Sequence, residues 1–370
     1  MDAATRAVAE PGEPPRHAAC GAGSRDEDAR DTARSPVAPQ GAGAQAPADF
    51  LPAGNPRPVL QAAHDALACG EPAVLAVVLE TDGSTYARPG TLALFAGDTQ
   101  AGWLSGGCLE PELNRRAAQA AAAARIGWME IDTRDDGALF SGTALGCRGR
   151  LRIALLPLAL LPGIREGLAH WLAGGCTLQL ALSRDGEVAL RTARGAQAAR
   201  LPCDAPAWRD AARRWTLPLP RPPEALLLGA GPETPVLVGL LRDLGWRVAA
   251  AEPRPRWQPA CAAADDPAQS REALARSDAA LVMHHDFERD LAALDALART
   301  PVAFVGLLGP PRRRDDLLTL LDPDARAALA PRLHAPVGLD LGGQGPEAIA
   351  LSIAAQLQGW RATHAAATGA

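Results

Sequence analysis

The sequence predicts an α/β protein with an N-terminal α/β domain and a C-terminal Rossmann-like domain built on a parallel sheet. Three observations support this. The chain has 370 residues, which exceeds one ordinary hydrophobic core. Apolar residues make up 48% of it, and many fall in short continuous runs typical of buried strands. The turn Gly229-Ala230-Gly231 follows such a run and precedes a helical pattern, as in a βαβ unit.

Composition divides the chain into five segments. Residues 1–50 mix Pro, Gly, Ala and both charges with few large apolar residues, so we expect a disordered tail. Residues 51–216 form the N-terminal domain. The proline-rich stretch 217–223 (LPLPRPP) reads as a linker. Residues 224–360 form the Rossmann-like domain, and residues 361–370 a frayed tail.

In the N-terminal domain, helical spacing at 58–68 precedes the buried apolar run 73–80, and the polar residues 81–85 then form a turn. The helix 109–125 carries Glu110 and Glu112 in its first turn, which suits the helix dipole. The other expected elements are strands at 90–95, 101–105, 128–132 and 151–156, a helix from 165, and a hairpin formed by 177–182 and 188–192.

The C-terminal domain alternates strands and helices, which is the pattern of a parallel sheet. The apolar run 226–228 leads through the glycine turn into a helix that ends near Leu244. Further strands are expected at 247–251, 279–283 and 302–307, and a helix at 346–358.

Charge and composition exclude several functions. The net charge of −5 disfavours nucleic acid as the main partner. Because the sequence contains no lysine, it has neither a Walker A lysine nor a Schiff-base lysine. Seven cysteines without a CxxC pair argue against a zinc ribbon and fit a reducing compartment. No apolar run is long enough to cross a bilayer, and no signal pattern opens the chain. We therefore expect a cytoplasmic protein without a membrane partner.

The first candidate site is the junction Ser105-Gly106-Gly107-Cys108-Leu109-Glu110. Cys108 lies after two glycines and before a predicted helix. Free backbone N–H groups and the positive end of the helix dipole bind anions there and lower the pKa of a thiol. The alternative is a small buried cysteine at a turn that requires glycine.

A second glycine–cysteine junction contains Gly146, Cys147 and Arg148. An arginine beside such a loop neutralises phosphate or lowers the pKa of the cysteine. The alternative is a tight turn with solvated arginines. Ser84 belongs to a third polar loop, after the buried strand 73–80, where ligand contacts are common but a plain hairpin turn is also expected.

The Rossmann-like half contains a candidate nucleotide or anion site. Gly229 and Gly231 form the turn, and Glu252 ends the next strand about 20 residues later, where the ribose-binding acid of a Rossmann unit stands. Thr234 replaces the third glycine of the fingerprint, which weakens a dinucleotide assignment.

Two further groups end later strands of this half. His285 and Asp286 form either an acid–base pair or half of a metal site, although Asp286 equally suits a helix cap. Arg312 and Arg313 either hold an anion or begin a solvated helix.

Several motifs occur together in a fixed order. They are SGGCLE at 105–110, Gly-Cys at 146–147, GAGP at 229–232 with LGWRV at 244–248, His-Asp at 285–286, VGLLG at 305–309 and LHAPVGLDL at 333–341. From Pro58 to Trp360 the chain resembles the XdhC/CoxI family, the accessory proteins of xanthine-dehydrogenase-type molybdoenzymes. In the second junction the chain reads Gly-Cys-Arg-Gly-Arg where the family commonly has Cys-Gly-Gly, and Tyr86 stands where a small residue or proline is common.

The resemblance implies a maturation factor rather than an enzyme. Such a protein binds the molybdenum cofactor (molybdopterin), protects it, supports its sulfuration by a cysteine desulfurase, and inserts it into a xanthine-dehydrogenase-type apo-enzyme. It also implies a homodimer. The implied cofactor-binding residues are Gly106, Gly107, Cys108 and Cys147, with Ser84, and the resemblance leaves open whether Cys108 or Cys147 lies near molybdenum.

Two alternatives remain at the level of sequence. One is an NAD(P)-dependent oxidoreductase that uses the Rossmann half, with His285 and Asp286 as acid and base. The other is a scaffold that joins the desulfurase to the target enzyme without binding cofactor, in which case the glycine–cysteine junctions are structural.

Overall fold

The computed structural model describes residues 54–133, 148–208, 210–262, 264, 274 and 276–368, together with the short strands β1 (Ala48–Asp49) and β13 (Asp266–Pro267). The expected disordered tail therefore lies almost entirely outside the described residues, and so do Gly146 and Cys147.

The first sheet of the N-terminal half is antiparallel, in the order β4-β3-β2-β6-β5. Its strands are β2 (Ala73–Gly83), β3 (Leu92–Ala96), β4 (Thr99–Ala101), β5 (Gly127–Asp132) and β6 (Gly149–Pro157). The predicted strand at 101–105 has the wrong bounds, because β4 covers Thr99–Ala101. Strand pairing ends at Ala101, since Gly102 adopts a positive φ of 80° and turns the chain.

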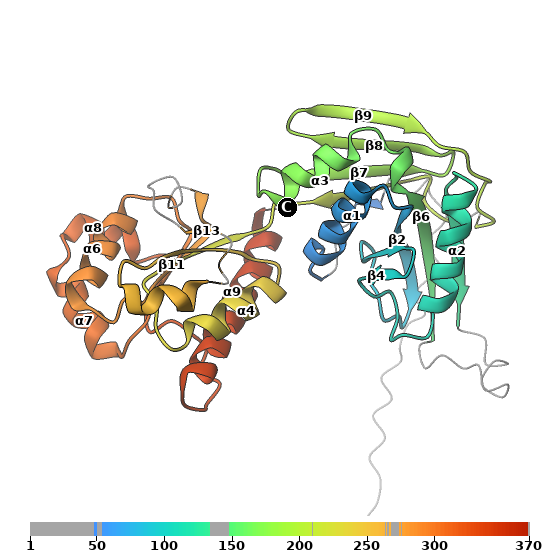
Figure 1. Cartoon of the computed structure of the whole chain (residues 1–370). Helices are drawn as coiled ribbons and strands as arrows, with labels where there is room; N and C mark the ends of the chain where they lie inside the picture. The colour runs from blue at the N-terminus through green and yellow to red at the C-terminus, as the bar shows by residue number, and fades with distance from the viewer. Residues whose placement is uncertain are drawn as a thin grey trace, which may run out of the picture. The chain divides into compact units, whose positions relative to one another are not determined.

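Two helices, α1 (Arg57–Cys69) and α2 (Glu110–Ala122), cover opposite faces of this sheet (Figure 1). Leu75, Val77 and Leu79 pack toward α1, while Val74, Ala76 and Val78 pack toward α2. Because both faces are covered, successive residues of β2 are all apolar, and this is why the sequence shows a continuous run instead of an alternating one.

A second sheet follows in the order β1-β10-β7-β8-β9. It contains β7 (Leu178–Ser183), β8 (Glu187–Thr192), β9 (Gly195–Arg200) and β10 (Arg214–Leu219), preceded by the short helix η2 (Leu158–Leu160) and by α3 (Ile164–Leu172). The expected linker 217–223 begins inside β10. Trp215, Leu217 and Leu219 alternate into the core, and this burial outweighs the disruptive effect of Pro218.

The C-terminal half confirms the predicted parallel sheet. Its strand order is β13-β12-β11-β14-β15-β16, and every neighbouring pair is parallel. The remaining strands are β11 (Glu224–Leu228), β12 (Arg247–Ala251), β14 (Ala279–Val282), β15 (Phe304–Leu307) and β16 (Leu333–His334).

Helices cover both faces of this parallel sheet (Figure 1). One face packs against α4 (Thr234–Asp243) and α9 (Pro346–Thr368), and the other against α6 (Phe287–Ala298), α7 (Pro311–Leu320) and α8 (Pro323–Leu329). A 3-10 segment, η3 (Pro255–Cys261), follows β12. Helix α9 runs to Thr368, so most of the segment expected to fray is helical.

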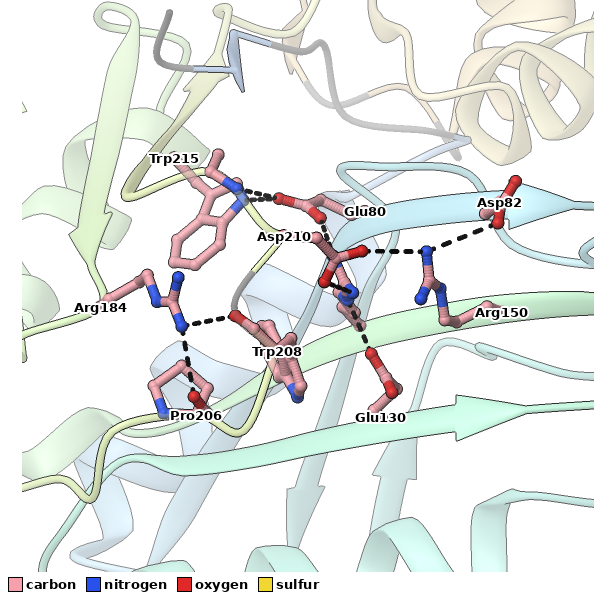
Figure 2. A network of polar contacts seen from close by, with 11 residues as sticks. Glu80, Asp82, Glu130, Arg150, Arg184, Pro206, Trp208, Asp210 and Trp215 are labelled. Carbon is pink, nitrogen blue, oxygen red and sulfur yellow. Dashed lines mark hydrogen bonds and ion pairs between the residues drawn. The ribbon is translucent and has the colours of Figure 1, made fainter. Parts of the chain in front are cut away.

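A buried arginine joins the strands of the N-terminal half. The Arg152 side chain, 4% exposed, donates to Glu130 at 2.7 Å, Glu80 at 2.8 Å and Asp210 at 2.5 Å. Glu80 also accepts from the indole N–H of Trp215, on β10, at 2.9 Å (Figure 2). Arg152 and Glu80 therefore connect β2, β5 and β6 to the second sheet.

The charges in this network stabilise one another. Burial disfavours the charged form of Arg152, but its hydrogen bonds to Glu130, Glu80 and Asp210 outweigh burial and raise its pKa. Burial likewise raises the pKa of Asp210, yet the hydrogen bond from Arg152 holds that pKa below its usual value. Arg152 and Asp210 are consequently both charged at neutral pH.

Replacing Arg152 by methionine leaves three carboxylates close together without their cation. We expect R152M to lower the free energy of unfolding by about 3 kcal/mol, at the low end for breaking a buried pair because the carboxylates reach solvent. Urea unfolding followed by tryptophan fluorescence measures the change. The control is R115M, which removes the exposed Arg115–Glu112 pair of α2 and should lower the free energy of unfolding much less. Equal losses in both variants would contradict a special role for Arg152.

Candidate functional site

Three loops leave the same end of the first sheet. The register pairs Val77 with Leu92, Leu94 with Ala101, and Gly83 with Gly149. These strands are antiparallel, so one end of the sheet carries four strand termini (Figure 1). They are the end of β2, the start of β3, the end of β4 and the start of β6. The loops 84–91 and 102–109 and the segment before Gly149 therefore emerge from the same end of the sheet. They carry the predicted residues Ser84, Gly106, Gly107, Cys108 and Arg148.

A buried pair, Ser105 and Glu110, shapes the loop 102–109. The Glu110 carboxylate accepts hydrogen bonds from the backbone N–H of Leu104 at 3.2 Å, from that of Ser105 at 2.9 Å, and from the Ser105 hydroxyl. The same hydroxyl oxygen accepts from the backbone N–H of Gly107 at 3.2 Å and of Leu109 at 3.1 Å. Two buried side chains thus fix the path of the backbone around Gly106 and Cys108.

Ionisation of Glu110 is part of this arrangement. Burial by itself raises the pKa of Glu110, but the hydrogen bonds from Ser105 and from backbone N–H groups outweigh it and hold the pKa below its usual value. Glu110 also occupies the first turn of α2, where the helix dipole favours a negative charge.

The loop presents Gly106, Gly107 and Cys108 to solvent. Gly107 has a φ of 103°, which glycine adopts readily and which lets the chain turn before α2. Within the described part of the chain, no group accepts from the backbone N–H of Gly106 or Cys108. The exposed thiol of Cys108 and these two donors therefore lie together on one surface loop, near the start of α2, and this set suits an anionic ligand with a soft metal.

Ser84 and Arg148 meet through their backbones. The N–H of Ser84 donates to the carbonyl oxygen of Arg148 at 3.0 Å. A side chain on Gly149 would place its Cβ 2.3 Å from the carbonyl oxygen of Ser84, so only glycine allows this close approach. Both Ser84 and Arg148 are exposed, and the structure brings them to the same sheet end as Cys108.

In the Rossmann half, Glu252 is already engaged by the chain itself. Its side chain is 1% exposed, and Arg254 binds both carboxylate oxygens, at 2.8 and 2.6 Å. Arg254 also donates to the carbonyl oxygens of Ala230 and His284, which follow β11 and β14. These two strands flank the crevice where a Rossmann fold binds a dinucleotide. Arg254 therefore spans that crevice. It also forms an ion pair with Glu252, the carboxylate that the sequence predicted would bind ribose.

The glycine turn of this half faces another carboxylate. Glu233, which is buried, lies at the start of α4, so near Gly231 that a Cβ there would approach its Oε1 within 2.5 Å. The backbone N–H of Gly231 donates to the Thr234 hydroxyl. The helix start that would hold a pyrophosphate is therefore already lined by the Glu233 side chain.

His285 pairs with Glu233, at 3.3 Å from Nε2 to Oε1, and has a left-handed φ of 56°. Asp286 instead caps α6 by accepting from the backbone N–H of Arg289. His285 and Asp286 thus have different hydrogen-bond partners, and Asp286 has the capping role that was its alternative.

Arg313 binds the fully buried carboxylate of Asp290 at 2.6 Å, and Asp290 also contacts His284. Burial raises the pKa of Asp290, but the hydrogen bonds from His284 and Arg313 outweigh burial and lower it. The Arg313 guanidinium is therefore engaged in an ion pair with Asp290, whereas Arg312 is exposed.

A cavity of about 530 Å³ lies apart from the predicted residues. It borders the end of α2 and the start of β5 and is lined by Trp128 and Trp208 together with Arg116 and Arg125. Each of these arginines is paired, Arg116 with Glu112 and Arg125 with Asp204. The cavity therefore adds no uncompensated positive charge for an anionic ligand.

Sequence reasoning missed Glu233 and Arg254, and it named Ser105 and Glu110 without the hydrogen bonds by which they organise the loop. The spacing of Ser105 and Glu110 around a glycine pair was visible, but their mutual hydrogen bond depends on the fold. Among the described residues, no group of three His, Cys, Asp or Glu side chains is arranged to hold a metal ion. Nor is any described helix both long and apolar enough to cross a membrane.

Fold and site together define an α/β protein with two halves. One half carries a glycine–cysteine loop, and in the other the side chains of Arg254 and Glu233 already occupy the Rossmann crevice. Residues 66–132 match the model of the XdhC and CoxI family, and residues 226–357 match the model of the XdhC Rossmann domain. The chain belongs to the XdhC/CoxI family, as its motif order predicted.

Two relatives cover most of the chain. A protein of Bacillus subtilis, named as a probable subunit of xanthine dehydrogenase, is 26% identical over an alignment of 321 residues, and the match covers 78% of this chain and 92% of the relative. The crystal structure of a xanthine dehydrogenase from Bacillus halodurans superposes with a TM-score of 0.68 at 26% identity, covering 82% of this chain and 96% of that one. Both names connect proteins of this kind with xanthine dehydrogenase.

The loop 102–109 should depend on the charge of Glu110. Because its pKa is lowered by folding, the stabilisation is complete above the unfolded pKa of ~4.3 and disappears as the pH falls through the folded pKa. We expect E110Q to lose about 1–3 kcal/mol of unfolding free energy at pH 7, and the difference from wild type to shrink below about pH 4. Chemical unfolding across pH measures both. The control is E112Q, whose carboxylate is on the surface and should matter less at every pH; a pH-independent loss in E110Q would contradict the role of its charge.

The Rossmann crevice should not bind a dinucleotide. Because Arg254 occupies Glu252 and Glu233 occupies the helix start, we expect titration with NADH or NADPH to give no saturable change in cofactor fluorescence up to millimolar concentration. The variant E252Q is the control. Saturable binding by the wild type that E252Q abolishes would mean that Glu252 binds ribose despite Arg254.

Proposed function

We propose that this protein carries the molybdenum cofactor to a xanthine-dehydrogenase-type enzyme. It protects the cofactor, supports its sulfuration and inserts it into the apo-enzyme. Family membership and the names of its relatives support an association with xanthine dehydrogenase. The cysteine desulfurase as sulfur donor, the homodimer and the cytoplasmic location belong to this proposal.

One observation carries the proposal: the loop 105–109 exposes a thiol and two open backbone N–H groups, while a buried Ser105–Glu110 pair fixes its shape. A site built in this way is organised before any ligand arrives. Preorganised donors lose little entropy on binding and so favour a specific ligand over a passing ion.

The residues present fit the chemical groups of the cofactor. Backbone N–H groups at Gly106 and Cys108, near the positive end of α2, would hold its phosphate or oxo groups. The Cys108 thiol, as a thiolate, would be a soft ligand at molybdenum. Ser84 and Arg148 at the same sheet end would add a hydroxyl and a cation, and Gly146 and Cys147 precede Arg148 in the chain.

The oxidoreductase alternative has less support. It needs an acid free to bind ribose and a helix start free to bind pyrophosphate. In this chain the acid, Glu252, is bound by Arg254, and the start of α4 is occupied by the Glu233 side chain. We therefore assign the Rossmann half a role other than hydride transfer.

Cofactor content tests the proposal. The protein is produced in a host that makes molybdenum cofactor and purified without oxygen, and released pterin is then oxidised and measured by fluorescence. We expect pterin near stoichiometry in the wild type and a loss of at least tenfold in C108A or C147A. The matched control is C69A, which removes an exposed thiol at the end of α1 and should retain the wild-type content.

Three outcomes separate the competing functions. Absence of pterin from the wild type would overturn the carrier proposal. Pterin retained in C108A and C147A alike would show that neither thiol holds the cofactor. Normal maturation of the client enzyme by both variants, with a wild type free of pterin, would favour the scaffold alternative.

A further inference from the structure

Strand β9 forms an open edge of the second sheet (Figure 1). It has six residues, five of them exposed, and among the described strands it pairs only with β8. Its sequence, GAQAAR, contains no proline and no lysine, and its register with β8 runs without a bulge. Folded proteins usually protect an edge with such devices, because its unpaired N–H and C=O groups can bind another strand.

The other outer strands offer less. Strands β1, β13 and β16 have two residues each, and β4 has three. Strand β5 has six residues, but its beginning packs against residues 202–208. The N–H of Ile126 donates to the carbonyl oxygen of Pro202 at 2.9 Å, and the rings of Trp128 and Trp208 are 5.7 Å apart. Of the described outer strands, β9 therefore presents the longest uncovered edge.

The turn between β8 and β9 decides which backbone groups face outward. Thr192 pairs with Gly195, so the connecting turn has only two residues. A two-residue turn closes on a hydrogen-bonded pair, and hydrogen-bonded and non-hydrogen-bonded pairs alternate along the strands from there. Ala196 and Ala198 fall in non-hydrogen-bonded pairs, so their N–H and C=O groups face away from β8. These groups are available to an added strand.

Two arginines accompany this edge on one face of the sheet. Arg191 lies on β8 and Arg200 ends β9. Because side chains alternate along a strand, both lie on the face opposite that of Leu190, which is buried in the core with α3. Both arginines are exposed, and no carboxylate of the described residues pairs with either. Glu187, opposite Arg200, is bound by Arg214 instead, at 2.8 Å.

This charge decides between possible occupants of the edge. A second copy that paired through its own β9 would bring two sets of these arginines together about a two-fold axis, and like charges on adjacent strands destabilise the pairing. An acidic segment would be attracted by the same two groups. The edge therefore favours an acidic partner over a second copy of the chain.

The other face of the β8–β9 hairpin carries a cavity of about 250 Å³, large enough for one side chain. It lies between the hairpin and α3, and is lined by Leu190 on one side and by Gly167 and His170 on the other. Gly167 allows a close approach, because a Cβ there would lie 3.1 Å from Leu190. Glu166 and Arg194 also line the cavity, and their opposite charges favour a neutral side chain over an ion.

We propose that β9 binds an extended acidic segment of a partner protein as an added strand. The main chain of that segment would pair with Ala196 and Ala198. Its acidic side chains would lie beside Arg191 and Arg200, and an apolar side chain on its other face would enter the cavity beside α3. Such a segment alternates acidic and apolar residues, since successive side chains of a strand point to opposite faces. The inference goes beyond the carrier proposal and does not depend on cofactor binding.

The probe is a fluorescein-labelled synthetic peptide in which glutamate and valine alternate, and the control peptide carries arginine in place of glutamate. Binding to the full-length protein is followed by fluorescence anisotropy at low ionic strength, where surface charges act most strongly. We expect saturable binding of the acidic peptide that weakens as salt is added. The basic peptide should bind at least about tenfold more weakly.

A charge reversal tests the two arginines. The double variant R191E/R200E should weaken binding of the acidic peptide about tenfold and strengthen binding of the basic one, because attraction and repulsion are exchanged. A merely structural role of the arginines would not produce that exchange. The matched control is R289E, which reverses an exposed charge on α6 and should leave both affinities unchanged.

A backbone substitution tests strand addition. A198P removes an N–H group that faces outward and leaves the hydrogen-bonded pairs with β8 in place, so we expect it to abolish peptide binding. A198G keeps the N–H group and should bind as the wild type does. Hydrogen exchange should also slow in the segment 195–200 when the acidic peptide is present. Unchanged melting temperatures of the variants show that the fold is intact.

Several outcomes would overturn the inference. One is a wild type that binds no acidic peptide, and another is binding that R191E/R200E and A198P both retain. Equal affinity for the acidic and basic peptides would remove the role of the arginines. Light scattering covers the remaining occupant: a wild-type dimer that A198P converts to a monomer would mean that a second copy, and not an acidic partner, pairs with β9.

Discussion

The N-terminal half depends on one buried cation. Arg152 satisfies Glu80, Glu130 and Asp210 at once, and Glu80 in turn accepts from Trp215 and from the backbone N–H of Ala212. Three strands and a second sheet thus meet at a single guanidinium, whose planar fork can donate in several directions. The neighbouring pair Arg150 and Asp82 extends the network to the last residues of β2 and the first of β6. The loop 84–91 and the segment before Gly149 begin there, at the ends of two strands that the Arg152 network joins.

Each half uses buried charges, but with opposite consequences for ligands. In the Rossmann half, Arg254 neutralises Glu252 across the crevice and Glu233 fills the helix start, so the groups that a dinucleotide needs are already occupied. In the N-terminal half, Glu110 and Ser105 lie beneath the surface and satisfy only some of the backbone N–H groups of their loop, while those of Gly106 and Cys108 stay open. The same physical requirement, that buried charge be paired, closes one site and organises the other.

Local patterns in the sequence predicted most of the fold. Continuous apolar runs located β2, β6 and the parallel strands, because sheets covered on both faces need them. The pattern failed at Leu217 and Leu219, where two prolines obscured an alternation that tertiary burial decides. The candidate site was predictable in its glycines and Cys108, which are fixed by local backbone geometry. The partner of Glu252 could not be predicted, because Arg254, two residues away in sequence, binds it in a geometry that β11 and β14 fix through their carbonyl groups.

A carrier must release its ligand as well as bind it, and the geometry of the loop surface is consistent with both. Cys108 and Gly106 are exposed, so a ligand held there would keep one side open to an acceptor protein. Hydrogen bonds from backbone N–H groups are individually modest and need no rearrangement of the core to break. The Ser105–Glu110 pair is buried beneath this loop and holds its backbone, and the Arg152 network joins the strands of the same half. Because buried hydrogen bonds fix the loop, the site remains formed when it is empty. Its contacts to a ligand are individually weak, as a protein that repeatedly binds and releases a ligand requires.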